Sequence, residues 1–222
     1  TLESGKYEEI KLNSKLTTGM ARDNGMYNIV STCSYGNTLD NIKIKEEWSK
    51  RYEQLKTIHT SEEIDKLKND FMYLDSKRLY KPDCFDFILE TIGIYSNFKI
   101  IELACSILIK KLYKIIEDIK ENSDNIKEIN DTMDNCYIIT ILNEDYTVGR
   151  ILDHELFNNY YNDKKLLTFN GFIKYHPHDK DSYIKLAFKD ITNINDIITI
   201  IDECVNNSIL KINTIKQIFT ID

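Results

Sequence analysis

Apolar and polar residues partly alternate near the start of the chain. From about Tyr7 to Leu16, and again from Met26 to Tyr35, β-forming residues recur with a period close to two. This pattern predicts two antiparallel strands. Thr17-Thr18-Gly19 and Asn24-Gly25 lie between them and favour turns.

The period then changes to three and four, which predicts a polar helix over residues 39–56. Its apolar face consists of Ile44, Trp48, Tyr52 and Leu55. A second helix is expected to begin at a Ser61 cap, because two acidic residues follow in the first turn. We interpret these helices, over residues 41–75, as an insertion between sheet elements. A single aromatic such as Trp48 on an amphipathic helix is typical of a core residue, although a partner-docking surface is the alternative.

A strand of mostly buried character is predicted over residues 85–91, followed by a turn at Gly93 and a helix capped by Ser96. The helix is expected to run for about 23 residues, or roughly 35 Å. Its narrow apolar face is typical of a helix-pair interface and contains Ile101, Cys105, Leu108, Leu112, Ile115 and Ile119. Residues 122–134 are polar and are predicted to form a linker.

The pattern restarts after this segment. A strand is predicted over residues 137–142, a helix over 147–159, and further strands over 167–175 and 183–188. The last helix repeats apolar residues at three and four, and its seam consists of Ile198, Ile201, Val205, Ser208, Ile212, Ile215 and Phe219. Only Ser208 interrupts it with a polar group.

Two long helices with apolar seams would be costly to expose. At about 25 cal/mol per Å², pairing five or six large side chains contributes roughly 8–15 kcal/mol. We therefore expect the two seams to pack on each other or on helices of the same fold. The residues predicted to form this interface are Ile101, Cys105, Leu108, Leu112, Ile198, Ile201, Val205 and Ile212.

Composition narrows the function classes. The 222 residues include 36 acidic and 29 basic side chains, so the net charge is −7, which argues against broad nucleic-acid contact. The five cysteines are far apart and odd in number, which favours free thiols in a reducing compartment over a disulfide framework. No apolar run approaches the roughly 18 residues of a membrane span. Because the first residue is Thr1, we expect that an upstream part is missing.

Candidate catalytic and metal-binding chemistry is weak. His176-Pro177-His178 has no third ligand nearby and is more typical of a turn than of a metal pair. His154 and Glu155 suggest acid–base chemistry, but no nucleophile or phosphate-binding loop accompanies them. There is also no acidic cluster of the kind that holds catalytic magnesium. We therefore predict no catalytic residue, no metal ligand and no cofactor.

Two motifs in the second half carry a resemblance to a known family. Glu144-Asp145-Tyr146-Thr147-Val148-Gly149-Arg150 is similar to a Glu-Asp-His-Thr-Leu-Gly-Asn run, and Phe169-Asn170-Gly171-Phe172 followed by His176-Pro177 is similar to Phe-Ala-Gly-Tyr and His-Pro elements at the same separation. Both belong to the small partner of the α-type assembly subunits of multisubunit DNA-directed RNA polymerases. This partner is the eleventh subunit in eukaryotes, with counterparts in archaea and in the bacterial α homodimer. Tyr146 and Arg150 depart from the family's His and Asn, so polar contacts made there must differ.

The first half resembles the latter part of the larger partner, which is the third-largest subunit in eukaryotes and has its own archaeal counterpart. Residues 22–30 lie where that family has a Lys-Glu-His-Ala-Lys-Trp-Ser-Pro-Val run, and residues 85–93 are similar to the strand by which that chain re-enters its dimerisation domain. Some relatives carry a cysteine-liganded metal in the inserted domain, but nothing here has that spacing. Both partners in one polypeptide suggest the fused form found in some large DNA viruses.

The resemblance implies an α+β fold with two pseudo-symmetric dimerisation modules. Its domains would be 1–79, the remainder of an inserted β-rich domain with two charged helices; 80–121, the end of the larger-partner module; 122–134, the linker; and 135–222, the small-partner-like module. The residues expected to face the large subunits are Arg22, Asn24, Tyr27, Glu144, Asp145, Tyr146, Thr147 and Arg150.

The implied function is a non-catalytic scaffold subunit that nucleates polymerase assembly by docking the two largest subunits. The implied partners are those subunits and other small polymerase subunits, without sequence-specific nucleic-acid contact or a membrane. The implied location is intracellular: the nucleus, a cytoplasmic viral factory or the virion. The alternatives are a stand-alone α+β protein-interaction or regulatory module and an unrecognised enzyme.

Overall fold

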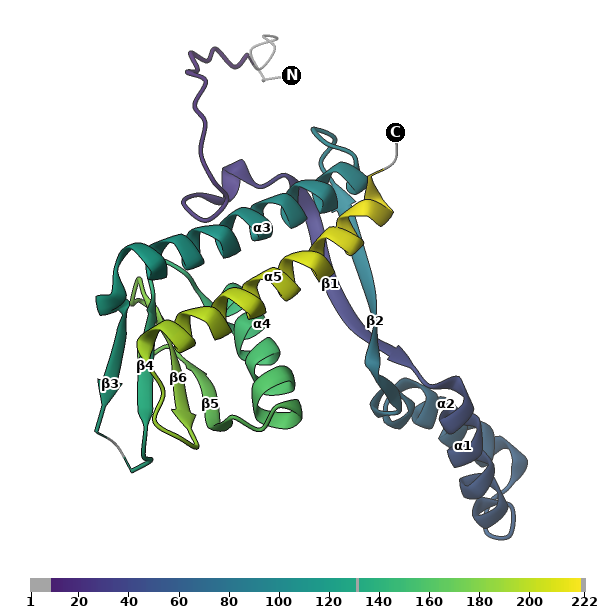
Figure 1. Cartoon of the computed structure of the whole chain (residues 1–222). Coiled ribbons are helices and arrows are strands. Elements are labelled where there is room, and N and C mark those ends of the chain that lie inside the picture. The colour runs from purple at the N-terminus through teal and green to yellow at the C-terminus, as the bar shows by residue number, and fades with distance from the viewer. Residues whose placement is uncertain (1–8, 131, 221–222) are drawn as a thin grey trace. The chain divides into compact units, whose positions relative to one another are not determined.

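The computed structural model describes residues 9–130 and 132–220. It mixes helices with antiparallel sheets, so the α+β prediction is confirmed (Figure 1). The chain divides into two compact units, Thr1–Asn97 (unit 1) and Phe98–Asp222 (unit 2). This boundary differs from the expected ones, because it falls inside the segment 80–121.

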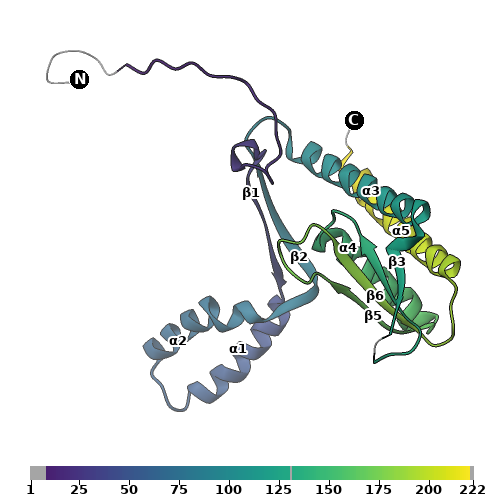
Figure 2. The same cartoon turned by 90° about the vertical axis from the view of Figure 1, so that its left-hand side faces the viewer.

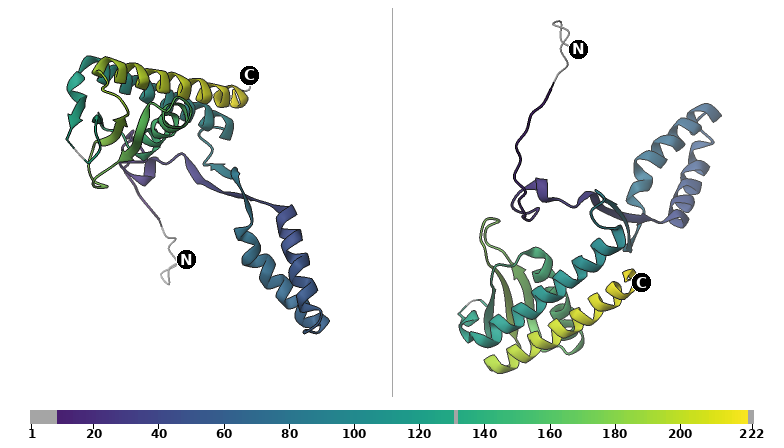
Figure 3. Two further views of the ribbon diagram at one scale, coloured as in Figure 1. Left: turned by 60° about the horizontal axis from the view of Figure 1, so that its bottom comes forward. Right: turned by 90° about the horizontal axis from the view of Figure 1, so that it is seen from above.

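Unit 1 is a two-stranded antiparallel ribbon of β1 (Val30–Leu39) and β2 (Tyr80–Thr91). Helices α1 (Asn41–Leu55) and α2 (Ser61–Tyr73) lie between these strands in the sequence and form a hairpin at the end of the ribbon (Figure 3). Their predicted insertion between sheet elements is therefore confirmed. Two short 3₁₀ segments, η1 (Gly25–Tyr27) and η2 (Asp75–Arg78), precede β1 and β2.

Three expectations for unit 1 are wrong. Residues 9–16 form no strand, while Tyr7 lies outside the described residues. The predicted burial of β2 is also wrong, because the strand is mostly exposed, with Phe87 at 73%. Its ribbon has two strands, and no other described element of unit 1 packs over its apolar side chains. Helix α2 is capped by Thr60 instead of Ser61, since Thr60 and Glu63 form a capping box in which the Thr60 N–H donates to Glu63 Oε2 at 3.0 Å.

Unit 2 is a four-stranded antiparallel sheet with the order β3-β4-β6-β5. Its elements in chain order are α3 (Asn97–Glu121), η3 (Ser123–Asn125), β3 (Ile126–Ile129), β4 (Cys136–Ile141), α4 (Tyr146–Leu156), the π-helix η4 (Phe157–Asp163), β5 (Leu167–Ile173), β6 (Ser182–Phe188) and α5 (Ile194–Phe219). The predicted linker is wrong in its centre. Ile126–Ile129 pairs with β4, and Ile126 is buried at the edge of the core.

Helices α3 and α5 lie side by side and run in opposite directions along the sheet (Figure 2). Near one end Lys120 Nζ lies 3.0 Å from Asp202 Oδ1, and at the other end the rings of Phe98 and Phe219 are 6.1 Å apart. All eight residues predicted for the helix-pair interface lie in one hydrophobic core or pack against it. Both apolar seams therefore enter a shared core over most of their length. The last two residues of the α5 seam, Ile215 (48% exposed) and Phe219, lie outside it.

Candidate partner-binding surfaces

The start of α4 follows directly from the chemistry of its turn. Asn143 has a φ of +55°, a conformation that Asn tolerates better than most residues, and its N–H donates to Asp181 Oδ1 at 2.8 Å. Asp145 then forms the N-cap, and its Oδ1 accepts from the Tyr146 N–H at 2.7 Å. A carboxylate is favourable here because the N-terminus of a helix carries partial positive charge. The predicted helix start is thus positioned by a turn and a cap.

Gly149 brings α4 close to β5. A Cβ atom built on this buried glycine would lie 1.9 Å from Phe172 Cε2, so only glycine permits the observed contact. The Phe172 ring also meets Tyr146 edge-on at 5.4 Å between centroids, and the Arg150 guanidinium lies 5.5 Å from its centroid. Phe172 therefore supports a surface on which Tyr146, 47% exposed, and the exposed Arg150 stand beside each other.

Acidic residues of the same turn serve the fold. Glu144 Oε2 lies 2.7 Å from Lys111 Nζ of α3, which ties the turn to that helix. Asp145 Oδ1 lies 3.4 Å from the Nζ of Lys174, whose side chain is almost completely buried. An ammonium group in such a place requires a nearby anion. Of the five residues predicted to contact partners here, Asp145, Tyr146, Thr147 and Arg150 are exposed and Glu144 is half-buried. Glu144 and Asp145 also hold the turn in place through their ion pairs.

The other three predicted contact residues lie in unit 1, around η1. Asn24 caps this segment, with its Oδ1 accepting from the Met26 N–H at 3.0 Å. The Tyr27 hydroxyl lies 2.8 Å from Thr17 Oγ1, and a Cβ on Gly19 would collide with the Tyr27 ring. Asn24 and Tyr27 thus shape their own loop, and Arg22 is exposed.

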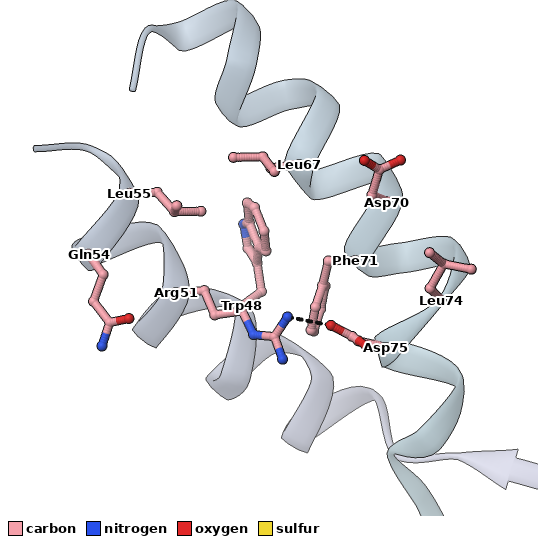
Figure 4. Close-up of a pocket in the computed structure, with 9 residues that line it drawn as sticks. All are labelled: Trp48, Arg51, Gln54, Leu55, Leu67, Asp70, Phe71, Leu74 and Asp75. Atoms are coloured by element: carbon pink, nitrogen blue, oxygen red, sulfur yellow. Dashed lines mark hydrogen bonds and ion pairs between the residues drawn. The ribbon is translucent and has the colours of Figure 1, made fainter. Parts of the chain in front are cut away.

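An apolar pocket of about 410 Å³ opens between α1 and α2 (Figure 4). Trp48 stacks obliquely on Phe71 at 5.4 Å, and the Arg51 guanidinium lies 4.7 Å from the centroid of the same Phe71 ring. Arg51 Nη1 donates to Asp75 Oδ2 at 2.6 Å, a bond that holds the pKa of the Asp75 carboxyl below its usual value. Trp48 therefore packs in a small core and also lines an open pocket. The interpretation of Trp48 as a core residue and its interpretation as part of a partner-docking surface are compatible.

Residues considered for catalysis have structural partners. Glu155 is buried and forms an ion pair with Lys211, while His154 lies 2.9 Å from Asn158 Nδ2. His176 Nδ1 accepts from the His178 N–H at 3.1 Å, as in a turn. Within residues 9–130 and 132–220, no group of three or more His, Cys, Asp or Glu side chains is arranged to hold a metal ion.

The sequence did not single out Lys174 or the role of Phe172 as the support of Tyr146 and Arg150. One signal was available, because a glycine within a predicted helix often marks a close approach of another element. Over the described part of the chain, no helix has the length and apolar character needed to cross a membrane. No protein-family model matches this chain, and no curated protein matches it.

Proposed function

We propose that this chain is a non-catalytic scaffold subunit of a DNA-directed RNA polymerase, with its second half acting as the small α-type partner. The observation that carries the proposal is the contact between two motifs. Gly149 of the Glu-Asp-Tyr-Thr-Val-Gly-Arg run packs on Phe172 of the Phe-Asn-Gly-Phe run, although the two motifs lie apart in the sequence. The family resemblance rests on these same two motifs, so their contact supports it.

A preformed surface on a packed core supports this function. The core shared by α3, α5 and the sheet holds α4 in place. Phe172 packs against Tyr146 and Arg150, and Arg150 Nη1 also donates to Asp153 Oδ2 at 3.1 Å. Arg and Tyr are enriched at the energetic centres of protein interfaces, because they combine a large contact area with directed hydrogen bonds. In this proposal the two largest subunits perform nucleotide addition, and this chain docks them.

The finer parts of the proposal depend on the resemblance. They are the pseudo-symmetry of two modules, the assignment of residues 80–121 to the larger partner, the viral source and the intracellular location. The antiparallel pairing of α3 and α5 agrees with two modules that meet through their long helices.

Charge reversal of Arg150 tests the docking surface. Arg150→Glu should reduce co-purification with the two largest subunits about 30-fold, as expected for an interface residue that contributes about 2 kcal/mol. Lys127→Glu, an equal charge change at an exposed position of β3, is the matched control. The circular dichroism spectrum should be unchanged in both variants. Equal recovery of the complex with Arg150→Glu and Lys127→Glu would refute a contact at this surface.

The alternative is a stand-alone α+β protein-interaction or regulatory module, which the open pocket beside Trp48 favours. The two functions differ in the native mass of the isolated protein. A polymerase subunit should be recovered in a stoichiometric complex with very large partners, whereas a stand-alone module should be recovered as a small species.

A further inference from the structure

Three departures from regular backbone geometry follow one another in unit 2. Residues Phe157–Asp163 form a π-helix, Lys165 has a φ of +53°, and the pairing of β5 with β6 shifts register between Leu167 and Phe169. π-helical turns and β-bulges are frequent at functional sites, because they redirect side chains. A lysine with a positive φ is uncommon. The residue that takes this left-handed conformation after a helix is usually glycine or asparagine.

The side chains of these irregular segments line one depression of about 410 Å³, which we call the Tyr161 pocket. Its lining consists of Tyr161, Asn162, Lys165, Leu167, Thr168 and Lys189. No carboxylate is among them, although Asp163 and Asp190 are close in sequence.

Two exposed ammonium groups in this pocket have no counter-ion within the described part of the chain. Neither Lys165 nor Lys189 forms a side-chain hydrogen bond or an ion pair with any described residue. Lys164 differs, because its Nζ lies 3.0 Å from Glu203 Oε2 and 3.2 Å from the Tyr160 hydroxyl. Two positive charges at one pocket repel each other and attract an anion. The net charge of the whole chain is −7, so this pocket has the opposite sign of charge to the chain as a whole.

An aromatic surface stands at the same place. The rings of Phe157 and Tyr161 are stacked, with 5.1 Å between centroids and 13° between planes. Both rings are about 40% exposed, at 43% and 40%. An exposed, flat aromatic ring beside lysines is the combination with which proteins bind single-stranded nucleic acid, since the ring stacks on a base and the lysines contact phosphate.

We propose that the Tyr161 pocket binds a nucleotide, with its phosphate between Lys165 and Lys189 and its base on Tyr161. The ligand class is a nucleoside phosphate, either free or as one unit of a single strand. Stacking and charge do not distinguish base sequences, so the site has no sequence preference. This inference does not rest on a role in a polymerase.

The test uses the full chain and two probes, a fluorescein-labelled uridine decanucleotide and a fluorescent ATP analogue, with binding followed by anisotropy at low salt. Two phosphate contacts predict that the logarithm of the decanucleotide binding constant falls with the logarithm of salt concentration with a slope of about −1.4. Lys189→Gln and Lys165→Asn should each weaken binding several-fold and halve the slope. Tyr161→Leu should weaken binding about ten-fold and leave the slope unchanged.

Lys165→Asn separates binding from folding, because asparagine adopts the backbone conformation of residue 165 more readily than lysine. Lys127→Gln, which removes one exposed charge from β3 at the opposite edge of the sheet, is the matched control. Saturable binding of either probe that is lost in the pocket variants and kept in the control supports the site, and the probe that binds identifies the source of the nucleotide. Absence of saturable binding, or equal weakening by Lys127→Gln, overturns it.

Discussion

Replacing Gly149 with alanine tests the contact between α4 and β5. The added Cβ would lie 1.9 Å from Phe172 Cε2 and 2.3 Å from Cδ2, distances at which atoms cannot coexist. The ring has little room to move away, because Phe172 is buried and is flanked by Tyr146 and Arg150. Relief therefore requires that the helix, the ring or both shift.

Two opposing effects set the change in the free energy of unfolding that Gly149→Ala causes. Overpacking of a well-filled core costs about 1–3 kcal/mol. Alanine in place of glycine within a helix recovers about 0.5–1 kcal/mol, because it lowers the conformational entropy of the unfolded chain. The difference predicts that Gly149→Ala lowers the free energy of unfolding of unit 2 by roughly 0.5–2 kcal/mol.

Urea unfolding followed by circular dichroism measures this change. Gly36→Ala in β1 is the control for a glycine replacement without a collision, since no atom lies within 4 Å of its added Cβ. Phe172→Leu should restore part of the stability lost in Gly149→Ala, so the double variant should be less destabilised than the sum of the single variants. A stabilised Gly149→Ala variant, or strict additivity with Phe172→Leu, would refute the packing described here.

Two further predictions concern titration and capping. Burial raises the pKa of Cys204 from its ordinary value of 9.0 to about 12, and that of Tyr160 from 10.0 to about 12. The contribution of these two neutral groups to the free energy of unfolding of unit 2 should therefore be fully present below about pH 9 and decrease as the pH approaches 12. Cys204→Ala should flatten this dependence in urea unfolding between pH 9 and 11, and parallel curves would contradict it. Thr60→Ala removes the cap of α2 and should cost about 1 kcal/mol. Emission of Trp48, the single tryptophan, reports on this hairpin, and an unchanged midpoint would count against the cap.

The long helices of unit 2 were predictable because their signal is local. Spacings of three and four place Ile101, Leu112, Ile201 and Val205 on single faces, and burial of those faces follows from the cost of exposing them. Strand β3 gave no comparable signal. Ile126 and Ile129 are isolated in a polar segment, and their strand exists because it pairs with β4, a contact that only the folded sheet supplies.

The local sequence pattern also did not predict features that depend on neighbouring elements, such as the burial of a strand. The apolar residues of β2 indicate a buried strand, but a sequence pattern does not show whether another layer covers it. In the candidate docking surface, the motif predicted the start of α4 and its exposed residues. The position of Phe172 beneath Tyr146 and Arg150 depends on the pairing of β5 with β6, which lies outside the motif itself.

The ribbon of unit 1 has a consequence for the insertion that it carries. Leu39 and Tyr80 are partners across the ribbon, and the Asp40 N–H donates to the Leu79 carbonyl at 2.9 Å, so the chain departs and returns at neighbouring points. The span that must be bridged is therefore the same for any inserted sequence. The α1–α2 hairpin can therefore be replaced by another inserted segment without moving the two ends of the ribbon. Evolution or protein engineering can lengthen it, shorten it or graft another module there, while the strands below keep their register.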